Sequence, residues 1–385
     1  MTVPCPVCRS ARTEEFLRRP RVPVHQNLIA RDAAQAAATK RGDLTMVVCA
    51  DCGFVFNASF DAALLEYGDR YDNTQEHSPA FSAHLDSLVS RLVNERGLRG
   101  RRIVEVGCGK GGFLRRLVEA DGKNSGVGFD PSYTGPGTDL GGRLRYEQRF
   151  YGPDCTDVPA DAVVCRHVIE HVSDPVGLLK EVRAALDHSP QAAVFFETPC
   201  VDWILKNGVV WDFFYEHCSL FTIGSLTTAF EAAGFSVDSA RHVFDGQYLW
   251  LEAHSSVAKA SPGRAAGRTL TLARTFVREE RLLVARWKEQ LDALRGFGKV
   301  AVWGAGAKGS TFADLLDPER NIVDCVVDVN PRKQGCYLAG TGHPIVAPGD
   351  LAARGVAGAI LMNPNYRTEI EGLLSRTDVK IQLIG

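Results

Sequence analysis

The chain has 385 residues, of which 45% are hydrophobic and 23% are charged, a composition that is ordinary for a folded globular protein. Because domains hold on the order of 150 residues, this length predicts two or three of them. The 44 basic and 46 acidic residues leave a net charge of -2, so no basic excess indicates nucleic-acid binding. No apolar run approaches the roughly 18 residues of a membrane span, and the first residues do not resemble a secretory signal. We therefore expect a cytoplasmic protein without a membrane partner.

Two pairs of cysteines near the N-terminus have the C-x2-C spacing of metal knuckles, Cys5 with Cys8 and Cys49 with Cys52. Each pair places two thiolates on one tight turn, and two such turns complete a tetrahedral site with four sulfur ligands. Gly53 follows the second pair and permits the backbone angles that such a turn needs. We expect a structural zinc ion, with redox-active or merely buried thiols as the alternatives.

A glycine-rich loop with Gly107, Gly109 and Gly111 follows a predicted buried strand at residues 102–106. The next strand ends at Asp130, which lies 130 − 109 = 21 residues beyond Gly109, where an acid can bind two ribose hydroxyls. A further strand begins at residue 161 and runs into a loop and helix by residue 172, another lies at residues 191–197, and these strands alternate with helical stretches. The pattern predicts a doubly wound parallel α/β sheet. Its loop is suited to S-adenosylmethionine (SAM), to NAD, or to no ligand at all.

Aromatic, acidic and imidazole side chains crowd together at residues 211–222, beyond the fourth predicted strand. Histidine is the commonest general base, and an aromatic wall excludes water from it. We therefore expect Tyr215, Glu216 and His217 to be catalytic, with a purely structural histidine as the alternative. His167 is expected to line the cofactor pocket, and His171 to pack at a helix start.

Two polar segments precede the sheet. Residues 66–78 include Tyr71 and are interpreted as a lid or a cofactor-contacting arm, or else as a solvated linker. His25 and Asn27 belong to a polar group near the first cysteine pair and are expected to face the substrate.

The C-terminal part repeats the strand, glycine turn and helix pattern. A connecting helix is predicted within residues 256–296, and the fingerprint Gly304-x-Gly306-x-x-Gly309 follows a strand at residues 299–303. This turn is suited to the diphosphate of a nucleotide-linked substrate, to NAD, or to no ligand. A short sequence after the strand at residues 358–361 falls at the same ligand-binding edge. Its members are Asn363, Asn365 and Tyr366.

The combined motifs resemble the bacterial zinc-containing, SAM-dependent C-methyltransferases of nucleotide-linked deoxysugar pathways. The resemblance covers nearly the whole chain and implies an α/β fold. Its core would be a class I SAM methyltransferase (Rossmann-like), with a small N-terminal four-cysteine zinc domain and a C-terminal Rossmann-like domain. The implied division is a zinc domain and arm at 1–85, a SAM domain at 86–255, a connecting helix at 256–296 and a nucleotide-binding domain at 297–385. A monomer is the default expectation.

The resemblance also implies residue roles. His217 would remove a proton from a carbon beside a sugar ketone, Glu216 would orient His217 or bind the amino group of SAM, and Tyr215 would donate to the enolate oxygen. The expected SAM-binding residues are Tyr71, Glu105, Gly107, Gly109, Gly111, Asp130, Pro131 and His167. The expected substrate-binding residues are His25, Asn27, Gly306, Lys308, Asn363, Asn365 and Tyr366.

One residue departs from the family pattern. The family's active-site segment runs Tyr-x-Glu-His, whereas this chain has Phe214 at the tyrosine position. The identity of the sugar and of the methylated atom therefore stays open, and O- or N-methylation of a sugar or another small metabolite is the alternative. An NAD-dependent oxidoreductase or epimerase that uses the C-terminal fingerprint is a further alternative.

Overall fold

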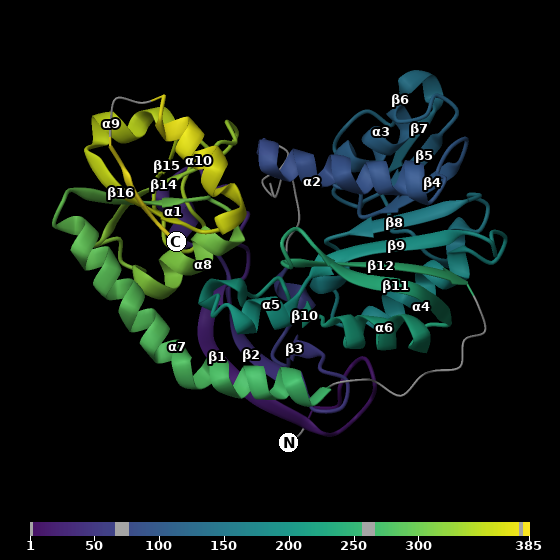
Figure 1. Cartoon of the computed structure of the whole chain (residues 1–385), viewed down its shortest axis with the longest axis horizontal. Helices are drawn as coiled ribbons and strands as arrows, with labels where there is room; N and C mark the ends of the chain where they lie inside the picture. The colour runs from purple at the N-terminus through teal and green to yellow at the C-terminus, as the bar shows by residue number, and fades with distance from the viewer. Residues whose placement is uncertain (1–2, 66–76, 256–265, 377–379) are drawn as a thin grey trace.

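The computed structural model describes residues 3–65, 77–255, 266–376 and 380–385, and their strands form three sheets (Figure 1). A small N-terminal sheet lies at the bottom of the view, a large sheet at the right and a C-terminal sheet at the left. Tyr71, an expected SAM contact, lies outside the described residues.

The N-terminal sheet is antiparallel, with the strand order β1-β2-β3-β10. Leu44, Met46 and Val48 alternate along β2 and are fully buried, because every second side chain of a strand points to the same face. Strand β10 comes from much later in the chain and begins two residues after His217. The predicted catalytic segment is therefore tied directly to this sheet. The elements are β1 (Thr13–Pro23), α1 (Ala33–Ala37), β2 (Arg41–Cys49), β3 (Val55–Asn57) and β10 (Ser219–Leu220).

The large sheet has the strand order β11-β12-β9-β8-β4-β5-β7-β6. Strand β12 runs antiparallel to both of its neighbours, while β9, β8, β4, β5 and β7 are parallel. This order confirms the expected class I methyltransferase fold. Its strands are β4 (Arg102–Val106), β5 (Ser125–Phe129), β6 (Thr138–Asp139), β7 (Leu144–Glu147), β8 (Ala162–Arg166), β9 (Ala193–Pro199), β11 (Phe235–Val243) and β12 (Tyr248–Ser255). Its helices are α2 (Pro79–Ser90), α3 (Gly112–Glu119), α4 (Pro175–Ala185), α5 (Val201–Lys206) and α6 (Ile223–Ala232).

The C-terminal sheet is parallel and has the order β15-β14-β13-β16-β17. The long helix α7 (Ala266–Arg295) runs from the N-terminal sheet to this sheet, as Figure 1 shows. The strands are β13 (Lys299–Trp303), β14 (Val323–Val327), β15 (Ile345–Val346), β16 (Val356–Leu361) and β17 (Gln382–Ile384). The helices are α8 (Ala307–Leu316), α9 (Leu351–Arg354) and α10 (Arg367–Leu374).

Two hydrophobic cores join the three sheets. One connects the N-terminal sheet to the large sheet, and the other connects the N-terminal sheet to the C-terminal sheet. The second core contains Met46 of β2, Trp211 of the predicted catalytic segment, Phe276 of α7 and Phe312 of α8. Burying a side chain such as Phe276 contributes roughly 1.5–3 kcal/mol, so the three sheets are held in a defined arrangement around the space between them.

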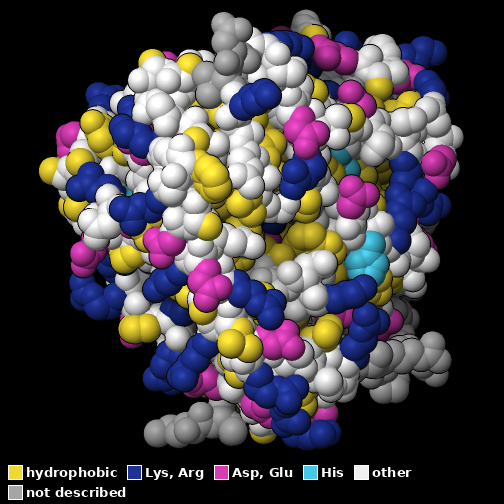
Figure 2. All heavy atoms as spheres, turned by 60° about the vertical axis from the view of Figure 1, so that its left-hand side comes forward, with side chains coloured by type: hydrophobic (Ala, Val, Ile, Leu, Met, Phe, Trp, Pro, Cys, Tyr) yellow, Lys and Arg dark blue, Asp and Glu magenta, His cyan; other side chains and the backbone are white. Residues whose placement is uncertain are grey.

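The surface in Figure 2 mixes both signs of charge. Lysine and arginine side chains alternate with aspartate and glutamate across this face, and no large area of one sign is visible. None of the helices in the described part of the chain is both long and apolar enough to cross a bilayer.

Candidate active site

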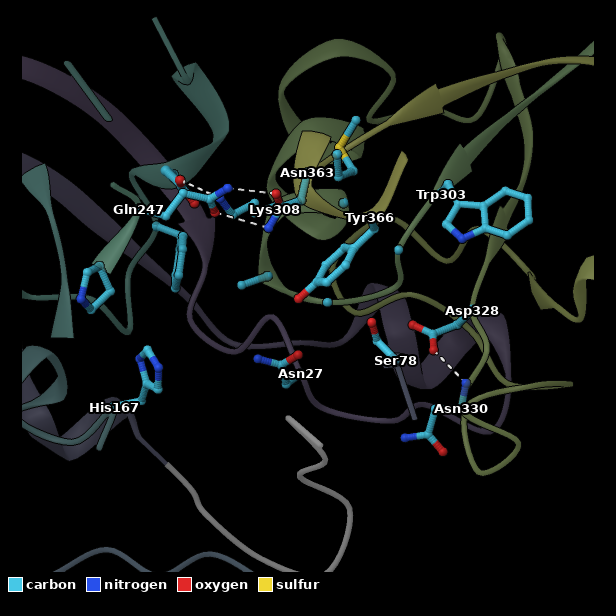
Figure 3. A pocket seen from close by; sticks show the side chains of 18 of the residues that line it. Asn27, Ser78, His167, Gln247, Trp303, Lys308, Asp328, Asn330, Asn363 and Tyr366 are labelled. Carbon is cyan, nitrogen blue, oxygen red and sulfur yellow. Dashed lines mark hydrogen bonds and ion pairs between the residues drawn. The ribbon is translucent and has the colours of Figure 1, made fainter. Parts of the chain in front are cut away.

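A cavity of about 250 Å³ lies between the large sheet and the C-terminal sheet (Figure 3). Three parts of the chain supply its wall, with Asn27 from the N-terminal segment, His167 from the large sheet and Trp303 from the C-terminal sheet. In Figure 3, His167 lies on one side, Trp303 and Asp328 lie on the other, and Asn27 and Tyr366 lie between them. The cavity therefore brings His217, one of the three predicted catalytic residues, and the C-terminal glycine turn into one space.

His217 lines the cavity beside two other rings. Its ring centre is 4.1 Å from that of Phe214 and 4.9 Å from that of His171. Burial lowers the pKa of His217 well below its usual value, and the nearby His171, His167 and Lys308 lower it further. His217 is therefore a neutral imidazole at pH 7, with a nitrogen able to accept a proton.

His167 has the opposite electrostatic setting. Its Nδ1 lies 3.1 Å from Oε1 of Glu170, and its Nε2 lies 3.4 Å from Oε2 of Glu197. Burial alone would lower the pKa of His167, but hydrogen bonds to these two carboxylates outweigh it and raise the pKa to about 9. The same wall thus holds one charged and one neutral imidazole, a separation that is typical of acid–base sites.

A buried ionic network fixes this wall from behind. Arg166 donates to Glu197 at 2.7 Å, and His84 of α2 lies 2.6 Å from the other oxygen of Glu197. Burial alone would raise the pKa of Glu197, but the charge of Arg166 and the hydrogen bonds of His167 and His84 hold it well below its usual value. The sequence interpretation missed Glu197, although its place at the end of a predicted strand was a usable signal.

Tyr215 and Glu216 lie behind the cavity wall rather than in it. The Tyr215 hydroxyl accepts the backbone N–H of Asp61 at 2.8 Å. The Glu216 carboxylate is fully buried, accepts the backbone N–H of Gln26 at 3.0 Å and lies 3.1 Å from Nδ1 of His25. These residues, and His25 with them, are not in the described lining. Their geometry supports positioning roles instead of the expected contacts with SAM or substrate.

The reason is that the side chains of this segment point in two different directions. Phe214 and His217 face the cavity, while the two residues between them face the N-terminal sheet. Glu216 thereby anchors the loop that presents Asn27 to the cavity. The position at which the family has tyrosine is occupied here by Phe214, a ring without a hydroxyl that packs directly against His217.

The glycine loop after β4 leaves an open side. Gly107 and Gly111 have φ values of 69° and 79°, and a Cβ on them would lie 2.2 Å from Val168 and 2.5 Å from Tyr146. Gly109 also has positive φ, 55°, but a Cβ there would meet nothing within 4 Å among the described residues. The first two glycines are required by packing, whereas Gly109 leaves room for a ligand to approach the backbone.

Polar groups suited to SAM surround this open side. Asp130 follows β5 and accepts the Gly109 N–H at 2.8 Å. Glu105 is buried and accepts the Leu114 N–H at 3.1 Å, which fixes the start of α3. Pro131 is exposed next to Asp130. The loop, the acid and the strand order have the chemistry to bind a SAM molecule.

We expect the Gly109→Val variant to bind S-adenosylhomocysteine at least roughly tenfold more weakly, because a β-branched residue at positive φ is strained and its side chain enters the ligand space. Isothermal titration calorimetry measures this. The control is Gly122→Ala, at a position with ordinary φ and open surroundings. Equal affinity in wild type and Gly109→Val would remove the loop from the SAM site.

In the C-terminal glycine turn, as in the loop after β4, some glycines are required by the backbone and one leaves space for a ligand. Gly304 has a φ of 115°, and a Cβ on Gly309 would lie 1.9 Å from the Gly304 carbonyl oxygen. Both are required by the backbone. A Cβ on Gly306 would have its nearest neighbour, Oδ1 of Asn27, at 3.7 Å. Gly306 therefore leaves space on the cavity side, where α8 begins.

Polar residues complete this side of the cavity. Asp328 follows β14 and accepts the backbone N–H groups of Ala305 at 2.9 Å and Asn330 at 2.8 Å. Lys333 donates to the Ala305 carbonyl at 3.0 Å. Among the described residues, Nδ2 of Asn330 has no hydrogen-bond partner although it is buried. A donor in this state at a cavity wall is suited to an acceptor on a ligand.

The remaining predicted substrate residues divide between two tasks. Tyr366 lines the cavity, and burial raises the pKa of its hydroxyl, which stays protonated. Asn363 also lines it but exchanges hydrogen bonds of 2.8 and 3.0 Å with Gln247. Asn365 donates to the Phe244 carbonyl at 3.2 Å and is not in the described lining. Asn365 therefore holds the β11–β12 turn against the C-terminal sheet instead of touching the cavity.

The four N-terminal cysteines converge on one point. Sγ of Cys5 is 3.6 Å from that of Cys52, and Sγ of Cys8 is 3.5 Å from that of Cys49. All four sulfur atoms lie within 4.8 Å of one another. Zinc–sulfur bonds of about 2.3 Å place tetrahedral sulfur ligands about 3.8 Å apart, so the cluster fits one zinc ion. It leaves no open ligand position and is suited to a structural role.

Comparisons with known proteins match both halves of this arrangement. A profile described as "Methyltransferase domain" matches residues 76–240, and one described as "C-methyltransferase C-terminal domain" matches residues 266–379. The C-methyltransferase NovU of Streptomyces niveus is 26% identical over 95% of this chain and 90% of its own length.

Other similarities are partial. Ubiquinone biosynthesis O-methyltransferase of Aliivibrio fischeri (strain MJ11) is 29% identical over 33% of this chain, which spans 56% of that relative. The crystal structure of N,N-8-amino-8-demethyl-D-riboflavin dimethyltransferase from Streptomyces davawensis is 21% identical. It covers 46% of this chain and 54% of its own, with a TM-score of 0.36.

Proposed function

Because the chain belongs to the class I SAM-dependent C-methyltransferases, we propose that it methylates a carbon beside the ketone of a nucleotide-linked deoxysugar. The observation that carries this proposal is the shared cavity, in which His217 and the glycine turn at Gly306 line one space. A substrate with a reactive sugar at one end and a nucleoside diphosphate at the other has the chemistry to contact both. The proposal includes a cytoplasmic monomer, the four-part division at residues 85, 255 and 296, and a structural zinc ion.

The chain's own residues would generate the nucleophile. When bound, SAM supplies an electrophilic methyl group, so the protein has to produce a nucleophilic carbon and align it. His217 would accept the proton from the carbon beside the ketone at an unprotonated ring nitrogen, leaving an enolate. The ring of Phe214 against His217 keeps water from that nitrogen.

The enolate oxygen needs a hydrogen-bond donor. Tyr215, the donor expected from the sequence, is engaged with Asp61. We assign this task to His171, which lines the cavity with its ring 4.9 Å from that of His217. His167 would carry a fixed positive charge on the same wall, balanced by Glu170 and Glu197.

The test separates carbon from heteroatom methylation. Wild-type protein is incubated in D2O, without SAM, with nucleotide-linked keto-deoxysugars, and NMR follows the carbon-bound hydrogens beside the ketone. Exchange for deuterium, followed by a carbon-bound methyl group when SAM is added, supports the proposal. A methyl group on oxygen or nitrogen without exchange would favour the alternative, to which the partial similarity to an O-methyltransferase lends support.

A further inference from the structure

Lys308 carries a neutralised positive charge inside the cavity. It lies in the first turn of α8, two residues beyond Gly306, and its Nζ is 2.7 Å from Oδ2 of Asp212. The side chains are 24% and 10% exposed, respectively, and both residues line the cavity. The ammonium also lies 5.4 Å from the centre of the Trp203 ring. The ion pair is therefore partly protected from water, which strengthens it, and both of its side chains can still be reached by a ligand in the cavity.

The surroundings of Lys308 favour an anion on the cavity side. Gly306 leaves the start of α8 uncovered, where the helix presents backbone N–H groups and the positive end of its dipole. The amide of Asn330 is 1% exposed, and among the described residues its Nδ2 has no hydrogen-bond partner, so it adds a free donor to the wall of the same cavity. Asp212 is the negative group that already occupies Lys308.

We propose that the substrate's diphosphate replaces Asp212 on the Lys308 ammonium, an inference that rests on the proposed nucleotide-linked substrate. The Lys308–Asp212 ion pair is then a latch, by which we mean an ion pair that the correct substrate opens. The exchange makes and breaks only ionic hydrogen bonds. A phosphate can replace a carboxylate here because both accept charge-assisted hydrogen bonds from an ammonium. A sugar without phosphate brings no charge to replace Asp212, so the latch selects nucleotide-linked substrates.

Opening the latch also affects the catalytic segment. Asp212 ends the short helical turn η6 (Val210–Asp212), five residues before His217. Burial, the two neighbouring histidines and the Lys308 charge all lower the pKa of His217. A diphosphate carries more negative charge than the Asp212 carboxylate that it replaces, so its binding offsets the Lys308 contribution more fully and makes His217 a stronger base when the correct substrate is bound.

The latch gives an unusual expectation for binding. Removing the negative charge by Asp212→Asn frees Lys308, and we expect uridine or thymidine diphosphate to bind about tenfold more tightly than to wild type. Lys308→Met should weaken binding at least about tenfold. In the Lys308→Met background, Asp212→Asn should have no further effect, because its benefit passes through the ammonium. Calorimetry on the full chain measures all four affinities.

Two controls isolate the latch. Uridine and thymidine carry no phosphate and should not bind Asp212→Asn more tightly than wild type. Asp314→Asn removes another ion pair of α8, with Arg41 at 2.8 Å, outside the cavity lining, and should leave diphosphate affinity unchanged. Thermal unfolding checks that each variant folds, and Asp212→Ser replaces Asp212→Asn if the latter does not.

The outcomes separate the latch from the proposed function. If wild type binds a diphosphate and Asp212→Asn binds it equally or more weakly, the latch is excluded and Asp212 is a structural contact. If Asp212→Asn still increases diphosphate affinity in the Lys308→Met background, the latch is also excluded. If wild type binds neither diphosphate, the proposed substrate class falls, and the latch falls with it.

Discussion

Replacing His217 with alanine is expected to lower turnover by roughly 100-fold to 10,000-fold, the usual contribution of a general base, while S-adenosylhomocysteine binding stays unchanged. The side chain lines the cavity opposite the C-terminal glycine turn and is kept neutral by its burial. His254→Ala is the matched control, because His254 is exposed on β12 and pairs with Asp238. Steady-state kinetics with SAM and a nucleotide-linked keto-sugar measure the effect.

The pH dependence of kcat/KM tests the same residue. The pKa of His217 lies well below its ordinary value of 6.5, so the free protein keeps its base unprotonated as the pH falls through 6.5. The pH at which kcat/KM begins to fall on the acid side should therefore lie below the usual pKa range of histidine. For stability, the unfolded histidine binds a proton below pH 6.5 before the folded one does, so this group's contribution is present above that pH and is lost as the pH falls. Turnover at the wild-type rate in the His217→Ala variant would rule out His217 as the general base.

The two glycine turns and the cysteine pairs could be predicted from the sequence because each is a local pattern. A strand, a turn at positive φ and a helix follow one another within a dozen residues, and the loop conformation of Gly107 or Gly304 depends on immediate neighbours. The alternation of strands and helices similarly predicted that the large sheet is parallel and doubly wound, but not its strand order or the antiparallel β12. The carboxyl edge of that sheet then located the cavity.

The orientation of the site residues could not be predicted, since it depends on contacts between distant parts of the chain. His25 meets Glu216 across 191 positions, Gln247 meets Asn363 across 116, and Lys308 meets Asp212 across 96. No local spacing signals such pairs. The sequence therefore predicted a catalytic segment that does reach the cavity, but it did not distinguish the cavity-facing residues from those that anchor the segment.

Loss of the expected N-terminal zinc ion should strongly lower the thermal stability of the N-terminal sheet. Structural zinc sites with four ligands contribute about 10–16 kcal/mol in small peptides, which is comparable to the whole stability of a domain, about 5–15 kcal/mol. We therefore expect Cys52→Ser to lose zinc and to unfold the N-terminal sheet at a much lower temperature. Elemental analysis should find one zinc ion per wild-type chain, and Cys336→Ser, in the C-terminal part, should keep it.

The metal should matter for activity although it lies outside the cavity lining. Cys49 ends β2, which pairs with β3, and β3 pairs with β10 directly after the segment of His217. Melting this sheet removes the support of the predicted catalytic segment and of the loop that carries Asn27. The glycine loop after β4, where we expect SAM to bind, belongs to the large sheet instead. Cys52→Ser should therefore lose turnover yet still bind S-adenosylhomocysteine. A metal-free wild type with paired disulfides would instead support redox-active cysteines, and full turnover in Cys52→Ser would disconnect the cluster from the active site.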